Sequence, residues 1–400
     1  MSFTKFVGAN FDTDGTMHIW DAWNRADYTV YAQYTPRFAD EFGYQAPPAW
    51  STLTNAVHDE VLEPFGKQML VHQKAMGGNY KLARGMRSHI TPGHLDDVSF
   101  GGVVNGKPSD GEHSWLIPTD NWVDIEDWHW ACQLQQAQAM RFGVEHMRSL
   151  EPVNAGALIW QLNDDWPVVS WAAVDFDGHR KPVWYASRDF FAPRLATIQP
   201  RVSDEYRETH SWEGVKTATD HFELIVLNDT REAWKGSWKV ERVTLAGEVL
   251  ATQSFDDVEL GAVCHIGLPL AEDIVSYGDA GNELVVATPS DNAFARVIFN
   301  PTEIIDQKLT APAEAFSIAA VAVEDGVELT VTAKSYVRDL FCMADKVDAK
   351  ALVAEGMVSL LPGESVVLHI ATADAAALAD PSAFAAANVL RSANDLKREW

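Results

Sequence analysis

Residues 156–167 read Gly-Ala-Leu-Ile-Trp-Gln-Leu-Asn-Asp-Asp-Trp-Pro, an apolar run that ends abruptly in polar and aromatic side chains. The wider run over 154–163 has the length of a strand and follows a long helical pattern. A strand that is buried on both faces of a parallel sheet has this appearance. Polar groups at its carboxyl end lie where an α/β barrel keeps its active site. The stretch therefore predicts a buried strand of a parallel α/β sheet, with polar groups where an α/β barrel would carry its active site.

The preceding helix is predicted over 123–150, with Asp124 as its cap. A weaker helical pattern covers 54–74, where Pro64 should kink or break the helix, and a short strand is predicted over 37–43. An apolar stripe recurs every three or four residues along the long helix and predicts a face packed in the core. Its members are Trp130, Leu134, Ala137, Met140, Val144 and Met147.

The chain changes character after residue 220, where β-branched runs alternate with turn signals. The runs are HFELIVLND, ELVVATP, GVELTVTA and ESVVLHIAT, and the turns include Asp325-Gly326 and Pro362-Gly363. Such punctuation is typical of antiparallel sandwich domains. We therefore predict an α/β part over 1–192, followed by two β-sandwiches over 193–300 and 301–400.

Composition excludes several classes of function. A formal net charge of -26 makes nucleic acid an improbable partner, because binding phosphates requires lysine and arginine. The sequence contains no apolar run of membrane-spanning length and no signal-peptide core near its start. Its three cysteines are far apart, and His89 and His94 lack metal-ligand spacing, so we expect a cytoplasmic protein without metal or cofactor.

The segment 37–43 contains two adjacent carboxylates. If it is a regular strand, Glu41 shares a face with Arg37 and small residues, whereas Asp40 faces the other side. A carboxylate with that much room suits an ionised nucleophile. A strand-end carboxylate in a surface ion pair is the plainer interpretation.

Two further segments carry groups that suit a sugar. Trp160, Asn163 and Asp164 follow the predicted strand, and an indole ring stacks on a sugar while amide and carboxylate groups bind hydroxyls. His18 and Trp20 would share a face of an extended segment. Core aromatic residues and a capping turn would also account for the residues after the strand.

Taken together, these segments resemble the β-mannosidases of glycoside hydrolase family 2. The corresponding motifs are GTMHIW at 15–20, RFADEFGYQ at 37–45 and WQLNDDWPVVSW at 160–171, in the family's order and with His72-Gln-Lys74 between them. The later segments 174–193 and 341–364 resemble the end of the family's barrel and its C-terminal immunoglobulin-like domain. The resemblance runs through nearly the whole chain, and it implies that 1–192 is the C-terminal part of a (β/α)8 TIM barrel and that the two sandwiches are immunoglobulin-like.

By that resemblance, Glu41 is the nucleophile of a retaining glycosidase that acts on terminal β-D-mannosides through a covalent intermediate. The resemblance also implies that Trp160 contacts the sugar and that His18 and Trp20 line the pocket. The expected partner is a glycoside or oligosaccharide.

This chain departs from the family pattern at two places. Asp40 stands where the family usually has serine, beside the implied nucleophile. Residues 95–122 look like an insertion, which would form either a surface excursion or part of a lid with Trp115 and Trp122.

The second carboxyl group of a retaining glycosidase is not evident in this sequence. The family's acid/base is a glutamate after asparagine, upstream of His18, but no glutamate precedes His18, and the one Asn-Glu pair is Asn282-Glu283. About 190 residues are also fewer than the ~250 of a complete barrel. We therefore expect the C-terminal portion of such an enzyme, either from a truncated or mis-started reading frame or as one half of a split enzyme whose N-terminal portion is a separate partner chain.

Two alternatives remain at this point. The chain is either a carbohydrate-binding or structural remnant without catalysis, or a family 2 enzyme for a β-galactoside, β-glucuronide or glucosaminide. Nothing in the residues themselves selects mannose.

Overall fold

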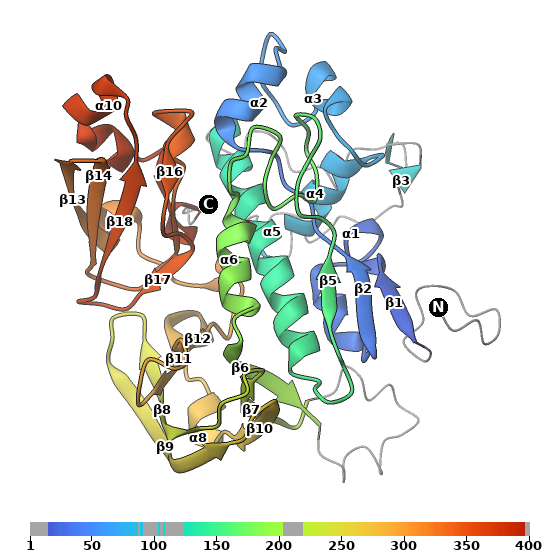
Figure 1. Cartoon of the computed structure of the whole chain (residues 1–400), viewed down its shortest axis with the longest axis vertical. Helices are drawn as coiled ribbons and strands as arrows, with labels where there is room; N and C mark the ends of the chain where they lie inside the picture. The colour runs from blue at the N-terminus through green and yellow to red at the C-terminus, as the bar shows by residue number, and fades with distance from the viewer. Residues whose placement is uncertain are drawn as a thin grey trace.

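A computed structural model describes residues 15–86, 89–90, 124–202 and 219–396, together with the backbone of 103–104 and 107–108. Three parts are visible in Figure 1: a small parallel sheet with its helices and two groups of antiparallel strands. The predicted insertion at 95–122, with Trp115 and Trp122, lies outside the described residues apart from the short strands β3 (Val103–Val104) and β4 (Lys107–Pro108).

The N-terminal part contains a parallel sheet of three described strands. These are β1 (Thr16–Ile19), β2 (Phe38–Phe42) and β5 (Ala157–Ile159), in the order β1-β2-β5. Both neighbouring pairs are parallel. Parallel strands separated by helices agree with the predicted barrel segment, but three strands do not distinguish a barrel from an open sheet, so the TIM barrel stays a prediction. The helical elements here are α1 (Asp21–Asn24), η1 (Tyr28–Gln33), α2 (Trp50–Ala56), α3 (Lys67–Val71), α4 (Gly78–Met86), α5 (Ile125–Arg148) and α6 (Pro182–Phe190).

Helix α5 confirms the sequence prediction closely. The Asp124 carboxylate accepts hydrogen bonds from the backbone N–H groups of Glu126 and Asp127, at 2.9 and 3.0 Å, and so satisfies two of the free donors at the helix start. Every residue of the predicted apolar stripe is buried. Propensity, cap and periodicity agree here, which is why the boundaries could be predicted.

The predicted helix over 54–74 is wrong as a continuous element. Helix α2 ends at Ala56, and α3 begins only at Lys67. Pro64 lies in the turn between them, where its ring and its missing N–H end the helical hydrogen bonding. The sequence correctly indicated the break but not its length.

The prediction that 154–163 forms a strand buried on both faces is also wrong. Strand β5 contains only three residues, and Leu158 in its centre is 56% exposed. The reason is topological, because β5 pairs with β2 alone among the described strands and therefore lies at an edge of the sheet. The apolar side chains show that this strand is suited to burial, but the fold places no described strand on its second side.

Two groups of antiparallel strands follow, and each consists of two sheets that share a core. The first group has the sheets β10-β7-β6 and β12-β11-β8-β9, and the second has β13-β14-β18-β16 and β17-β15-β19. The predicted strand runs correspond to β7, β11, β14 and β18. The assignment to immunoglobulin-like domains over 193–300 and 301–400 stays a prediction. The strands are β6 (Arg194–Arg201), β7 (His221–Asn228), β8 (Trp234–Thr244), β9 (Val249–Leu260), β10 (Cys264–Pro269), β11 (Glu283–Pro289), β12 (Val297–Phe299), β13 (Phe316–Val323), β14 (Gly326–Ala333), β15 (Val337–Cys342), β16 (Leu352–Val353), β17 (Val358–Leu360), β18 (Ser365–Ala371) and β19 (Leu390–Arg391).

Short helical turns connect these strands. They are α8 (Glu272–Val275), η4 (Ala280–Asn282), η5 (Ile304–Asp306), α9 (Pro312–Ala315), η6 (Ala344–Lys346), α10 (Ala375–Ala379), η7 (Pro381–Ala385) and η8 (Ala393–Leu396). No helix in the described ranges is long and apolar enough to cross a membrane.

Helices α5 and α6 lie between the parallel sheet and the C-terminal strands (Figure 1). Buried polar contacts fasten that junction: Arg391 forms an ion pair with Asp127 at 2.6 Å, and the Trp130 indole donates to the carbonyl of Ser392 at 2.9 Å. One apolar core runs through the contact and includes Tyr336 and Phe341 from the C-terminal part. The N-terminal part, which contains the parallel sheet, thus packs against the antiparallel C-terminal strands.

A buried imidazole joins the N-terminal part to the segment between the two sandwiches. His89 lies between Asp27 and Glu303, with ring nitrogens 2.5 and 2.9 Å from their carboxylates, and it stacks on Tyr28. Burial lowers the pKa of His89, but the hydrogen bonds to the two acids outweigh burial and raise that pKa to about 9. The imidazole is therefore charged at neutral pH.

Candidate active site

Between its paired positions, strand β2 has one residue more than β1 and one more than β5, and this irregularity shapes the site. Met17 pairs with Ala39 and His18 pairs with Glu41, which leaves Asp40 without a partner in β1. The pairing with β5 shows the same shift beyond Ala39. Asp40 therefore occupies a β-bulge, which bends a strand and re-aims its side chains.

The bulge overturns the predicted alternation of side chains. Ala39 and Phe42, three residues apart, are both fully buried, whereas Asp40 and Glu41 between them are only partly covered. The expectation that Asp40 faces away from Glu41 is wrong, because both carboxylates approach the same imidazole. Sequence spacing could not reveal this, since an extra residue in one strand is visible only against its partners.

Glu41 lies at the carboxyl end of the central strand, and its side chain is 31% exposed. The Trp20 indole Nε1 donates a hydrogen bond of 2.8 Å to Glu41 Oε1. Because an indole N–H only donates, this contact orients the carboxylate without supplying a proton acceptor. Trp20 in turn packs edge-on against Trp171, with ring centroids 5.6 Å apart.

His18 lies between the two acids of the bulged strand. Its Nε2 is 3.5 Å from Asp40 Oδ1, and its Nδ1 is 4.0 Å from Glu41 Oε1. The predicted grouping of His18 and Trp20 is therefore present around Glu41. Arg37, the cation that the sequence offered as a neighbour, is exposed instead.

Trp160 follows β5 and lies beside the end of β2. Its backbone N–H donates to the Phe42 carbonyl at 2.7 Å, and its side chain remains 42% exposed. A Cβ on Gly43 would lie 2.1 Å from the Trp160 carbonyl oxygen, so only glycine permits this approach. The Trp160–Gln161 peptide bond is cis. An exposed tryptophan thus lies at the strand end, bonded through its backbone to Phe42, the residue after Glu41.

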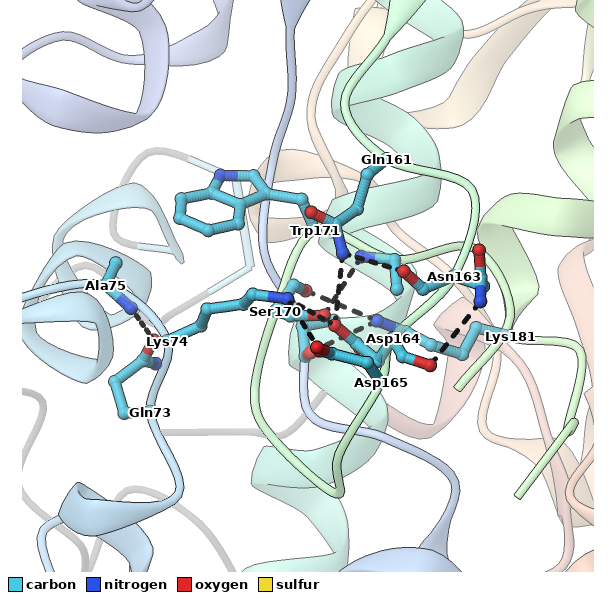
Figure 2. A network of polar contacts seen from close by, with 12 residues as sticks. Gln73, Lys74, Ala75, Gln161, Asn163, Asp164, Asp165, Ser170, Trp171 and Lys181 are labelled. Carbon is cyan, nitrogen blue, oxygen red and sulfur yellow. Dashed lines mark hydrogen bonds and ion pairs between the residues drawn. The ribbon is translucent and has the colours of Figure 1, made fainter. Parts of the chain in front are cut away.

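Asp164 belongs to a different environment, a closed polar network inside the loop 161–170 (Figure 2). Its carboxylate accepts from Lys74 Nζ at 3.1 Å and from Gln161 Nε2 at 3.2 Å, and a short hydrogen bond joins it to the Ser170 hydroxyl. Its side chain is 2% exposed. Because both oxygens are occupied and buried, the expected sugar contact of Asp164 does not fit this geometry.

The remaining residues of the loop separate into exposed and buried groups. Asn163 is exposed, as is Asp165, which lies 3.7 Å from Lys74 Nζ.

Lys181 was not selected from the sequence, although it belongs to the segment 174–193. It is buried, and its Nζ donates to the Ala46 carbonyl at 3.1 Å. Burial lowers the pKa of Lys181 to about 8.

Trp171 is a second group that the sequence interpretation left out. Its signal was its place in the motif at 160–171, and its structural role is to support Trp20 under Glu41. Among the described residues, no group of three or more histidine, cysteine or acidic side chains is arranged to hold a metal ion.

Glu283, from the one Asn-Glu pair of the sequence, lies far from this arrangement in the fold. It begins β11 in the first group of antiparallel strands and is buried. Its carboxylate forms a close ion pair with Arg242 and accepts from the backbone N–H of Asp279 at 2.7 Å. Glu283 is thus a structural carboxylate.

Comparisons with known proteins agree with the motifs. No protein-family model matches the chain. A β-mannosidase B of Neosartorya fischeri is 27% identical over 234 residues, which are 56% of this chain and 23% of that protein. The β-D-mannosidase of Dictyoglomus thermophilum shares the fold with a TM-score of 0.69 and 20% identity, over 91% of this chain and 39% of that one. For an exo-chitosanase of Amycolatopsis orientalis the TM-score is 0.52 at 14% identity, over 86% of this chain and 42% of that one.

These matches confirm the resemblance seen in the motifs. The chain is related in sequence to β-mannosidases, and its multidomain, β-rich fold is similar to that of a β-D-mannosidase. It spans less than a quarter of the length of the curated relative, as the 23% coverage shows.

Proposed function

We propose that this chain, a relative of the β-mannosidases, carries the nucleophile side of a retaining glycosidase site for terminal β-D-mannosides. The observation that carries the proposal is the setting of Glu41. It is a partly exposed carboxylate at the end of the central parallel strand, oriented by the Trp20 indole at 2.8 Å, and the next residue, Phe42, accepts a hydrogen bond from the backbone of the exposed Trp160.

In the first step, a Glu41 oxygen attacks the anomeric carbon. The bond between that carbon and the leaving oxygen breaks, and a glycosyl ester forms on Glu41. Trp20 holds Oε1, which leaves Oε2 as the attacking atom. The exposed ring of Trp160 provides an apolar surface for the sugar, in line with the role that the family resemblance implies.

The leaving oxygen requires a proton, and the second step requires a base for water. A retaining enzyme provides both through a second carboxyl group about 5 to 5.5 Å from the nucleophile. Among the described residues, Asp40 is the other acid drawn to this site, and it is directed to His18. Glu283 is held by Arg242 in another part of the fold. Since the sequence also has no Asn-Glu pair upstream of His18, we propose that the acid/base comes from a part of the enzyme outside this chain.

The buried network around Asp164 has a supporting role in this proposal. Gln161, Ser170 and Lys74 converge on one carboxylate and fix the loop that begins with Trp160 and ends with Trp171. Trp171 contacts Trp20, which contacts Glu41. Asp164 thus supports Trp20 through Trp171, while Asn163 and Asp165 stay exposed on the loop.

The test uses a substrate whose leaving group needs no proton. The chain is incubated with 2,4-dinitrophenyl β-D-mannoside, and the mass of the intact protein and of its peptides is followed. We expect release of dinitrophenolate and a mannosyl adduct on Glu41, with no adduct in E41Q. Asp165, which is 88% exposed, provides the matched control D165N with unchanged labelling. An adduct on another residue, or none at any substrate concentration, would contradict the proposal.

The same experiment separates the alternatives. In a carbohydrate-binding remnant, bound mannose would protect the tryptophan fluorescence from a quencher, but no mannosyl adduct would form on the protein. An enzyme for another sugar would be labelled faster by the dinitrophenyl β-galactoside, β-glucuronide or β-glucosaminide. Full hydrolysis of an unactivated aryl β-mannoside by this chain alone would exclude an acid/base outside it.

A further inference from the structure

We infer that Asp40 is a positioning residue that acts through His18, fixing the imidazole between the two carboxylates so that one ring nitrogen faces the bound sugar beside Glu41. The inference rests on the proposed function for the identity of that sugar site. Its geometry stands on the bulge in β2 and on the contacts of His18.

The first step concerns how Asp40 reaches His18. In a regular strand, neighbouring side chains point to opposite faces, and Asp40 would be directed away from Glu41. The extra residue between the paired positions Ala39 and Glu41 cancels that alternation. The bulge therefore brings an acid to an imidazole that a regular β2 would leave with Glu41 alone.

The second step concerns which carboxylate each ring nitrogen of His18 faces. Nε2 lies 3.5 Å from Asp40 Oδ1, while Nδ1 lies 4.0 Å from Glu41 Oε1. The Nε2–Oδ1 contact is not a hydrogen bond, so Asp40 acts on the ring through its nearby charge. Nδ1 is the nitrogen that faces Glu41, 4.0 Å from Oε1 and therefore beyond hydrogen-bond distance of that carboxylate.

The third step concerns what else compensates Asp40. Its Oδ1 is buried and has no hydrogen-bond partner among the described residues, and His18 Nε2 lies 3.5 Å from it. A buried carboxylate oxygen without a hydrogen bond is costly unless a positive or donating group lies near it. Asp40 and His18 are therefore mutually dependent, and the charge of Asp40 is directed to the ring instead of to Glu41.

The experiment uses the full chain and the variants D40N, D40S, D40E, H18Q and H18Q/D40N, with D165N as control. The first readout is the initial burst of dinitrophenolate from 2,4-dinitrophenyl β-D-mannoside as a function of substrate concentration. We expect D40N and D40S to lower kcat/KM roughly tenfold, the effect of losing one charge-assisted contact. D40E should recover part of the rate.

A double-mutant cycle separates action through His18 from any other role. If Asp40 acts through the imidazole, D40N has no further effect on the burst in the H18Q background. An equal loss in both backgrounds, or an unchanged burst in D40N and D40S, would overturn the inference. Thermal unfolding of each variant identifies a loss of burst rate that arises only from a destabilised fold. If D40N shows such a loss and the cycle shows no coupling between Asp40 and His18, the inference about Asp40 is also contradicted.

The second readout does not depend on activity. The ring nitrogens of His18 are followed by ¹⁵N NMR, and their signals are assigned by their absence in H18Q. We expect D40N to shift the Nε2 resonance, whereas D165N leaves it unchanged. If the wild type shows no burst, the proposed function fails, and this measurement still decides whether Asp40 sets the state of His18. Unchanged ring signals in D40N would overturn the inference independently.

Discussion

The end of β2 and the loop 161–170 both carry acids from family motifs, yet the fold gives them opposite environments. Glu41 is 31% exposed and accepts one recorded side-chain hydrogen bond, from Trp20. Asp164 is 2% exposed and accepts from three side chains. A carboxylate with an open oxygen is available to react, and one with every oxygen occupied holds its surroundings in place. Residue type alone therefore does not distinguish a reacting acid from a supporting one.

The strongest test of this contrast is removal of the open carboxylate. E41Q keeps the shape of the side chain but has no nucleophilic oxygen anion, so labelling by the dinitrophenyl mannoside should fall more than ~10³-fold, or over about 4 kcal/mol. Protein mass spectrometry measures the labelling. The unfolding midpoint of E41Q should remain close to that of the wild type, and a large drop in stability would show that Glu41 is a structural residue.

The supporting carboxylate should behave in the opposite way. D164A leaves Lys74, Gln161 and Ser170 without their shared acceptor, and loss of one partner of a buried ion pair costs about 3 kcal/mol. Urea unfolding of the wild type and D164A gives this difference. D165N is the matched control one residue along. Equal stability of D164A and D165N would contradict the supporting role of Asp164.

Buried ionic contacts that join the parts of the molecule should also respond to pH. The pKa of His89 is raised to about 9 by Asp27 and Glu303, against an ordinary value of about 6.5. Stabilisation by the imidazolium is therefore complete below about pH 6.5 and is lost as the pH rises through about 9, by an amount on the order of 2 to 3 kcal/mol.

The measurement is the free energy of unfolding from pH 6.5 to 9.5 for the wild type and for H89Q, which does not titrate. The pH dependence should be smaller in H89Q. His179, whose pKa is also raised to about 9, with Asp175 as its hydrogen-bond partner, contributes in the same window and remains in both proteins. Identical slopes in the two proteins would show that His89 carries no such linkage.

The smallest expected effect belongs to the exposed acid of the loop. D165N removes a charge that is 88% exposed and 3.7 Å from Lys74, so its stability should change by less than ~0.5 kcal/mol. Urea unfolding at low and high salt measures it. A larger loss would mean that the network around Lys74 extends to the surface.

Prediction from sequence succeeded where local and global preferences agreed. Helix α5 has a cap, a dipole-matched first turn and a regular apolar stripe, and every stripe position is buried. Four apolar runs after residue 220 became strands β7, β11, β14 and β18. Motif order also brought Glu41, Trp20 and His18 to one place, as the contacts of the site show.

Prediction failed where a neighbour decided the outcome. The run around Leu158 looked buried, but the strand has a partner on one described side only. The sugar contact predicted for Asp164 stays a prediction, although Lys74, which lies 90 residues away in the chain, already donates to that carboxylate. Burial and hydrogen-bond saturation depend on contacts between distant segments that no local pattern encodes.

By itself, the sequence determined which residue types stand at the strand ends and in what order, and this was sufficient to indicate the β-mannosidase resemblance and to select Glu41. Only the tertiary structure decided the direction and environment of each side chain. The bulge at Asp40 turns a second acid toward His18. It could not be predicted from one segment, because strand register depends on how two strands pair. We therefore propose that carboxylates of one chemistry serve as nucleophile, positioning group or support according to what the fold places around them.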